Sequence, residues 1–199
     1  MKLSNNQIFR ILLKSQPFLT KKDIDSFLRI TSYKAKENKE IIIQKGCSSK
    51  KAFFILKGAV KGYLTDKDET ENIILLRGEG YFVGDAKKLF KDDFQRYTYE
   101  AIQKTHILFF DYSDFEALAN QNPNIMKWLG NLLKEIIIMQ NYRIETFISM
   151  TAKERYLSLI EISPNFLEKV YAKYIAGFLG ITPVSLSRII NNLENKIKE

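Results

Sequence analysis

The sequence has few residues that bind metals or form disulfides: its 199 residues include one cysteine and one histidine. Tryptophan is equally rare, with one residue. Cys47 alone can form neither an intrachain disulfide nor a zinc or iron–sulfur site built from several thiolates. A catalytic pair of Cys47 with His106 would need a nucleophile motif, and neither residue lies in one. We therefore expect no metal and no iron–sulfur cluster, a thiol at a strand end, and a histidine on a barrel strand.

Long apolar runs are also absent. The longest stretch without a charged residue is Tyr174–Ser187, and its 14 residues include Gly177, Gly180 and Pro183. A membrane-spanning helix needs about 20 apolar residues, so we expect none here. The polar string Ser4–Gln7 near the start argues against a signal peptide. No paired carboxylates or nucleophile motif stand out, so we expect a cytoplasmic protein that is not an enzyme.

The composition is that of an ordinary globular protein, with 45% hydrophobic and 27% charged residues. The length allows one large domain or two small ones, because domains commonly contain roughly 100–200 residues. Lysine and arginine outnumber aspartate and glutamate by 31 to 23, which gives a formal charge of +8. This excess is consistent with a polyanionic partner, although many other proteins are as basic.

The hydrophobic period changes along the chain. Residues 1–30 have a helical pattern, with a capped helix start at Thr20–Asp23. From Tyr33 to Tyr112 short β segments follow one another, and the turn Thr65–Glu69 separates two of them. The segments are 40–43, 53–56, 60–64, 72–76, 97–102 and 106–110. Strands without crossover helices predict an antiparallel sandwich or barrel.

After Asp111 the period becomes helical. A short helix is expected over Asp114–Asn120, and Pro123 is well placed in the first turn of a long helix that reaches about Ser149. Apolar residues on the long helix follow the alternating spacing of 4 and 3 that is typical of a coiled-coil seam. The predicted dimer seam is Ile125, Leu129, Leu132, Ile136 and Met139. The alternative is a helix packed against its own barrel.

The C-terminal segment has the pattern of a helix-turn-helix. Thr151–Glu154 is a capping box for a helix to Ile162, and Ser163–Asn165 is expected to turn the chain. Within Tyr171–Leu193, two helices are predicted around Gly180, which has the freedom that a tight turn needs.

The second of these helices has two distinct faces. Thr182 is placed to cap it, with Pro183 at its first position. One face is the expected buried stripe, made of Leu186, Ile189, Ile190 and Leu193. The other face can enter a DNA major groove and carries Val184, Ser187, Arg188 and Asn191. The alternative is an ordinary helical hairpin within a core.

Three stretches carry a resemblance to a known family. Lys173–Ile189 resembles the helix-turn-helix of the Crp/Fnr family of bacterial transcription regulators, with its pattern IAxxLGITPxxLSRI. Phe54–Val60 is similar to a strand and turn of that family's sensor barrel, and Gly78–Asp85 to the approach to its phosphate-binding cassette. The resemblance extends from about residue 10 to the end of the sequence.

The resemblance implies an α+β fold: an N-terminal cyclic-nucleotide-binding-type β jelly roll, a long dimerisation helix and a C-terminal helix-turn-helix of winged-helix type. The corresponding divisions are residues 1–113, 114–149 and 150–199. Because the sequence ends six residues after Leu193, we expect the β-hairpin wing to be absent. The implied partners are double-stranded DNA, a second copy of the chain and RNA polymerase, with no membrane.

The resemblance also assigns roles to residues of the second helix. Pro183, Val184, Ser187 and Arg188 are expected to face bases, and Thr182, Ser185 and Asn191 to face phosphates. Arg188 is the main candidate for base recognition, because arginine can contact O6 and N7 of guanine together. The function implied is that of a homodimeric, sequence-specific transcription regulator. The alternative is a ligand- or protein-binding module without DNA recognition.

The expected ligand pocket departs from the family pattern. Gly84 and Asp85 match its start, but Gln95 stands 11 positions after Gly84, where the family has the phosphate-binding arginine. Arg96 follows one position later, and on a strand its side chain would point to the opposite face. The barrel is therefore not expected to bind cyclic AMP tightly, and its effector is unknown. A bulge near Asp92–Phe94 would restore the site, and a core of Phe82, Tyr97 and Tyr99 would fill it.

Overall fold

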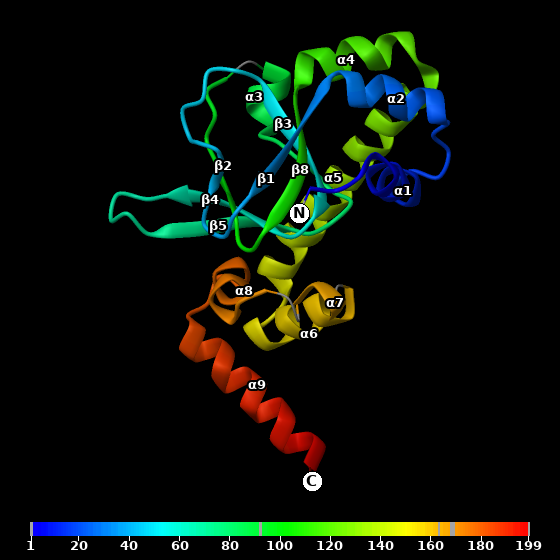
Figure 1. Cartoon of the computed structure of the whole chain (residues 1–199). Helices are drawn as coiled ribbons and strands as arrows, with labels where there is room; N and C mark the ends of the chain where they lie inside the picture. Colours follow the sequence, from blue (N-terminus) through cyan, green and yellow to red (C-terminus); the bar gives the residue numbers. More distant parts are fainter. Residues whose placement is uncertain (1, 92, 163, 168–169, 199) are drawn as a thin grey trace.

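The structure, a computed structural model, describes residues 2–91, 93–162, 164–167 and 170–198. A β structure with helices on its outside is joined by one long helix to a second helical group (Figure 1). The helices are α1 (Asn5–Ser15), α2 (Lys21–Arg29), α3 (Ala86–Lys91), α4 (Tyr112–Gln121), α5 (Pro123–Ser149), α6 (Ala152–Ile162), α7 (Pro164–Leu167), α8 (Ala172–Leu179) and α9 (Pro183–Lys198). The strands are β1 (Thr31–Lys36), β2 (Ile41–Ile43), β3 (Lys51–Lys57), β4 (Val60–Thr65), β5 (Glu71–Arg77), β6 (Phe82–Val83), β7 (Thr98–Ala101) and β8 (Thr105–Asp111).

The strands form two four-stranded antiparallel sheets, in the orders β1-β8-β3-β6 and β2-β7-β4-β5. Strands that follow each other in the sequence often lie in different sheets, as in a jelly roll. The predicted antiparallel barrel and the α+β class are therefore confirmed. Sequence patterns did not indicate β1, β6 or α3, which are short or mostly polar.

The apolar run in β3 shows why the two layers form. Successive side chains of a strand point to opposite faces. Phe53 and Ile55 therefore pack inside the barrel, while Phe54 and Leu56 pack against the helices on its outside. All four side chains are fully buried. A strand covered on both sides reads as a continuous apolar run, which is the pattern the sequence has here.

Trp128 of α5 anchors the helices to the outside of the barrel. Its ring meets Phe27 of α2 edge-on at 4.8 Å between centroids and Phe82 at 5.3 Å. The prediction that Phe82 belongs to the barrel interior is therefore wrong, because its position on β6 turns it outward to the helices. Tyr99 does lie in the interior, where it packs edge-on against Phe53, and Tyr97 packs beside it.

The predicted helix starts are confirmed. Thr20 and Asp23 form a reciprocal capping box on α2. Thr151 and Glu154 form the same arrangement at the start of α6. The helix expected from Asp114 starts earlier, at Tyr112, because the Asp111 carboxylate accepts from the backbone amide of Ser113.

Two further predictions concern isolated residues. His106 lies on β8 and hydrogen bonds with the Tyr33 hydroxyl, so it is a histidine on a barrel strand, as expected. Cys47 lies in the loop after β2, where its thiol contacts Ser49 Oγ at 3.4 Å. Ser163 of the expected turn lies outside the described residues, and Pro164 begins α7.

Within the described residues, no helix is both long enough and apolar enough to cross a bilayer.

Candidate functional site

Gly180 forms the turn between α8 and α9, as predicted. Its backbone is left-handed, with φ of +70°, a conformation that favours glycine. The Gly180 amide donates to Gly177 O, and the Ile181 amide donates to Ala176 O, so the last carbonyls of α8 are satisfied. A Cβ at this position would also lie 3.0 Å from the Phe147 ring of α5. The turn therefore has both conformational and steric reasons for glycine.

Thr182 caps α9, and Pro183 is its first residue. The Thr182 hydroxyl accepts from the Ser185 amide at 3.1 Å and hydrogen bonds with the Ser185 hydroxyl at 2.9 Å. This bond supplies one of the acceptors that the first turn of a helix lacks. Both hydroxyls lie at the end of α9 nearest the turn, which is where the resemblance expects phosphate contacts.

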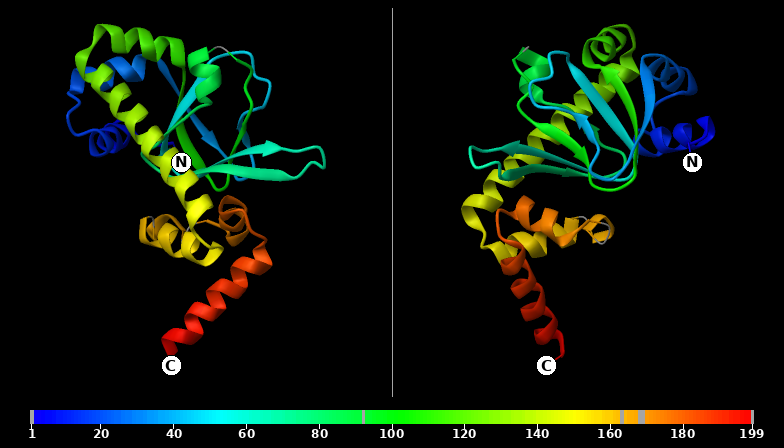
Figure 2. Two further views of the ribbon diagram at one scale, coloured as in Figure 1. Left: turned by 180° about the vertical axis from the view of Figure 1, so that it is seen from behind. Right: turned by 60° about the vertical axis from the view of Figure 1, so that its left-hand side comes forward.

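The remaining residues of α9 divide between two faces as predicted. Leu186 is buried at 1% exposure, and Ile189, Ile190 and Leu193 are half-buried. The opposite face carries Val184, Ser187, Arg188 and Asn191, which are all exposed. Figures 1 and 2 show that α9 extends away from the rest of the molecule. This face is therefore accessible to a large partner such as a duplex.

The helix α8 joins the helix-turn-helix to the β barrel. Its buried residues Tyr174 and Ile175 share one apolar cluster with Ile73 and Leu76 of β5. The approach is close, because a Cβ on Gly177 would lie 3.0 Å from the Ile73 side chain. The two parts of the chain thus share a core at this junction.

A buried lysine lies at the same junction. Lys61 of β4 is 2% exposed and pairs with Glu71 and, at 3.4 Å, with Glu100. Its ammonium group also lies 5.1 Å from the centre of the Tyr174 ring on α8. Burial opposes the charge, but the hydrogen bond to Glu71 and the negative charge of Glu100 outweigh it and raise the lysine pKa. Sequence reasoning missed this group, whose one signal is a lysine inside an apolar strand.

In the stretch that resembles the family's phosphate-binding cassette, the carboxylate of Asp85 is fully buried. It accepts from the Lys87 amide at 3.0 Å, from the Arg96 amide at 2.9 Å and from Arg96 Nη2 at 3.2 Å. The prediction that Arg96 points to the opposite face, away from the pocket, is therefore wrong, because Asp85 belongs to that pocket. It assumed strand geometry, but β7 begins only at Thr98, so the alternation of side chains does not extend to position 96. Of the proposed bulge, Asp92 lies outside the described residues.

Gln95 lies beside this pair but is turned to other partners. Its side chain is 1% exposed, and its amide donates to the Tyr97 carbonyl at 2.6 Å.

The Arg96 guanidinium remains charged beside Asp85. Burial disfavours its charged form, but the hydrogen bond and the negative charge of Asp85 outweigh burial and raise the pKa of Arg96. At Gly84 a Cβ would lie 2.7 Å from Leu89 Cδ1, so a side chain there would displace the end of this leucine.

These contacts were tested against the needs of a cyclic phosphate. Such a group needs a cation whose charge is not already balanced. Here the Arg96 charge is balanced by Asp85, although its Nε is buried without a partner among the described residues. Gln95 is neutral, and Tyr99 occupies the barrel interior against Gly62, where a Cβ would lie 2.8 Å from the ring. The cassette therefore does not fit a tightly held cyclic phosphate.

Of the five residues of the predicted dimer seam on α5, Ile136 is 36% exposed, and the other four contact their own chain. Ile125 and Leu129 are buried in the core of their own chain, and Leu132 packs against that core. Ile125 and Leu129 are too deeply buried to contact a second chain, so this part of the prediction is wrong. Met139 also faces its own chain, where its sulfur accepts from Arg77 Nη2 at 3.0 Å.

A second apolar stripe lies on a neighbouring side of α5, one residue later along the helix. One position turns an α-helix by about 100°. The stripe includes Ile137, Ile144 and Ile148, which are 60%, 57% and 82% exposed. At Gly130 nothing lies within 4 Å of a built Cβ, so this position is open to a neighbour. The displaced stripe is Met126, Gly130, Leu133, Ile137, Ile144 and Ile148.

Comparison with known proteins defines the class of the barrel. Residues 33–122 match the family described as "Cyclic nucleotide-binding domain". A curated relative from Rhodopseudomonas palustris, named as a potassium channel protein, is 26% identical over 116 residues. This match covers 58% of the present chain and 27% of that protein. The chain thus combines a domain of the cyclic-nucleotide-binding type with a long helix and a helix-turn-helix.

Solved structures extend the likeness to the whole arrangement. The c-di-GMP-responsive global regulator CLP of Xanthomonas campestris is 14% identical and has a TM-score of 0.72, with coverage of 89% of this chain and 93% of that one. FixK2 of Bradyrhizobium japonicum is 18% identical with a TM-score of 0.72, and the match covers 84% of this chain and 86% of that one. A CooA mutant from Carboxydothermus hydrogenoformans is 16% identical with a TM-score of 0.72, and the match covers 98% of this chain and 87% of that one. These structural neighbours are Crp/Fnr-type transcription regulators, so the predicted architecture is confirmed at the level of the fold.

Proposed function

We propose that this protein is a homodimeric, sequence-specific DNA-binding transcription regulator of the Crp/Fnr type. The observation that carries the proposal is the face of α9 formed by Val184, Ser187, Arg188 and Asn191. This face is exposed, stands on a capped helix and projects from the molecule, which is the geometry of a recognition helix in a major groove (Figure 2). Pro183, Val184, Ser187 and Arg188 are assigned to bases, and Thr182, Ser185 and Asn191 to phosphates.

The second part of the proposal is dimerisation through α5. The displaced stripe is apolar, and its members Met126, Ile137, Ile144 and Ile148 are exposed, whereas Leu133 is half-buried against the core of its own chain. Its spacing of 4 and 3 from Met126 to Ile137 matches a coiled-coil seam. A parallel pair of α5 helices would place two α9 helices at a fixed separation, as two half-sites on DNA require.

The third part concerns the sensor. The barrel is assigned to a role other than tight binding of cyclic AMP, because Asp85 already balances the charge of Arg96. The protein would act in the cytoplasm by binding DNA and RNA polymerase rather than as an enzyme. The alternative, a binding module without DNA recognition, makes a different prediction in the experiment below.

Selection from a pool of random duplexes tests the proposal. The native protein should enrich a motif with two half-sites, and the preference should fall when Arg188 is replaced. A binding module would enrich no sequence. Recovery of unenriched duplexes by a folded protein would therefore overturn the proposed function. Repeating the selection with candidate effectors would show whether any of them changes the affinity.

A further inference from the structure

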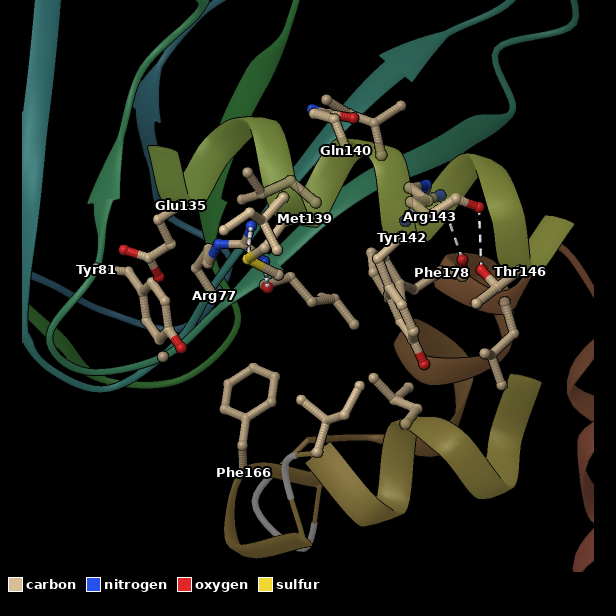
Figure 3. A pocket seen from close by; sticks show the side chains of 18 of the residues that line it. Arg77, Tyr81, Glu135, Met139, Gln140, Tyr142, Arg143, Thr146, Phe166 and Phe178 are labelled. Atoms are coloured by element: carbon tan, nitrogen blue, oxygen red, sulfur yellow. Dashed lines mark hydrogen bonds between the residues drawn. The ribbon is translucent and has the colours of Figure 1, made fainter. Parts of the chain in front are cut away.

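A cavity of about 750 Å³ lies where the barrel, the long helix and the helix-turn-helix meet. Its walls come from β5 and the loop after it, from α5, and from α6 to α8. Figure 3 shows Arg77 and Arg143 at different ends of the cavity, with Met139 and Tyr142 of α5 between them and Phe166 on the opposite side. The volume lies in the range of pockets that hold small organic molecules, roughly 300–1,000 Å³.

Most of the lining is apolar. Ile138 of α5, Leu159 of α6 and Phe178 of α8 approach the same space from three helices. Met139 adds a flexible thioether, a group that adapts to the shape of an apolar partner. An occupant must therefore be largely apolar to replace water favourably.

Three guanidinium groups interrupt the apolar lining: those of Arg77, Arg143 and Arg155. In the described part of the chain, none of them lies within 4.0 Å of a carboxylate. The wall also contains Lys134 and two carboxyl groups. Glu79 accepts from the Gly58 amide at 3.4 Å, and burial raises the pKa of Glu135, even though the charge of Arg77 opposes the change. The cavity thus has more positive than negative charge.

The hydrogen bonds of these arginines leave donors unused. Arg143 Nη2 donates to the carbonyls of Ile73 and Phe178 at 3.2 and 3.3 Å, and Arg155 donates to those of Met150 and Leu179. Arg143 Nη1 and Arg155 Nε are buried and have no partner in the described structure.

An unsatisfied donor of this kind is costly, and a buried guanidinium without a counter-charge more so. Burial and the positive charge of Arg77 lower the pKa of Arg143 to about 10. A negatively charged hydrogen-bond acceptor in the cavity would therefore satisfy the unused donors and also balance the positive charge.

We propose that this cavity binds an elongated, largely apolar molecule that carries one carboxylate. The carboxylate would lie against the guanidinium of Arg143 or Arg155 and supply the missing counter-charge. Because the unused donors are buried, the side chain would turn toward the cavity to donate to it. The apolar part would lie along α5 toward Met139 and Phe166.

The location gives such a ligand a regulatory role, a consequence that rests on the proposed function. Arg143 of α5 already joins Ile73 in the sensor to Phe178 in the helix-turn-helix. A ligand in contact with both would favour the arrangement seen here over others and so change the affinity for DNA.

Calorimetric titration of the native protein with decanoate, and with decanol as its neutral counterpart, tests the site directly. Decanoate should bind at least tenfold more tightly than decanol. No binding of decanoate, or equal binding of both, would overturn the proposal. This comparison needs neither DNA nor a variant, so a failure of the proposed function would not affect it.

Variants then locate the site. Arg143→Gln should weaken decanoate binding at least tenfold and leave decanol unchanged, whereas Leu159→Trp should weaken both by filling the cavity. Arg29→Gln is the matched control, because Arg29 is exposed on α2, far along the chain from the cavity residues. Unchanged decanoate binding by folded Arg143→Gln protein would contradict the site.

If circular dichroism shows that Arg143→Gln unfolds, Arg155→Gln removes the second guanidinium assigned to the carboxylate and replaces it in the test. Addition of decanoate to the protein–DNA complex is the last arm. A change in DNA affinity supports the regulatory role, and a bound ligand without any such change refutes it.

Discussion

Arg188 is the residue on which base recognition depends most in this account. Its side chain is exposed on α9 and can present two parallel N–H donors to one guanine. Arg188→Ala should remove the preference for one base pair in each half-site, at a cost of roughly 1–3 kcal/mol per half-site. Competition between duplexes that differ at that pair measures the loss.

Two further variants separate recognition from charge. Arg188→Lys keeps the charge but lacks the paired donors, so it should also lose the preference. Arg10→Ala removes one exposed cation from α1 and should leave the preference unchanged. Unaltered base preference in folded Arg188→Ala protein would show that another side chain reads the sequence.

The cassette gives a second prediction about single residues. Cyclic AMP should not bind at micromolar concentration, because its phosphate would have to compete with Asp85 for Arg96. Titration calorimetry on the native protein and on Arg96→Ala measures this. Micromolar binding that disappears in Arg96→Ala would mean that Arg96 can leave Asp85 for a ligand, and the assignment of the barrel would then be wrong.

For α5, the displaced stripe and the seam predicted from the sequence give opposite expectations for lysine substitutions. Lysines at Ile137 and Ile144 should place charges in the displaced stripe, where both positions are exposed in the single chain. Burying apolar surface contributes about 25 cal/mol per Å², so a stripe of a few hundred Å² is worth several kcal/mol to a dimer. The double variant should therefore sediment as a folded monomer.

The control distinguishes the displaced seam from the one first predicted. Lysines at Leu64 and Phe94, which are exposed but distant from α5 in sequence, should leave the dimer intact. Lysine at Leu132 should instead lower the stability of the fold, because this residue packs on its own core. A folded dimer of the Ile137 and Ile144 variant would rule out the displaced stripe.

The junction between α2 and α5 depends on one carboxylate. Asp23 accepts from the side-chain amides of Asn122 and Asn124 at 2.7 and 2.8 Å, and from Thr20. Burial opposes its ionisation, but these hydrogen bonds outweigh burial and lower its pKa from 3.8 to about 2. The difference corresponds to roughly 2 kcal/mol of stability.

This stability should be present at pH 5 and above, and should be lost as the pH falls from about 4 to about 2. Urea unfolding of the native protein and of Asp23→Asn should therefore give curves that differ at pH 7 and converge near pH 2. A constant difference across this range would show that Asp23 does not titrate as its contacts indicate.

The elements with local signals were predictable from the sequence. The start of α9 follows from Thr182 and Pro183, and the turn before it from Gly180, because caps and left-handed glycines act within a few residues. The register of the seam was not predictable, because α5 is apolar on two sides near Leu132 and Ile137. Only the packed barrel decides which side remains exposed.

At the scale of the whole molecule, the sequence pattern does not show which distant segments pack against each other. The position of Arg96 depends on where β7 begins, and the pairing of Lys61 with Glu71 and Glu100 depends on sheet registry. The shared core of α8 and β5 likewise joins residues about 100 positions apart. Periodicity within a segment carries no information about such contacts.

The whole-molecule account requires two recognition helices that are held at a fixed spacing by α5. In a dimer of this type the half-sites are centred roughly 34 Å apart, about one turn of DNA or 10–10.5 base pairs. Inserting about 5 base pairs between them moves one half-site to the opposite side of the duplex. A rigid pair of helices cannot then reach both.

The affinity for the selected duplex before and after this insertion tests the central claim most directly. Fluorescence anisotropy at constant salt is the measurement, because salt changes the affinity of any phosphate-binding protein. The account predicts that the half-turn insertion lowers the affinity at least tenfold and that a full-turn insertion costs less. Equal affinity for all three duplexes would contradict a dimer that reads two half-sites through α9.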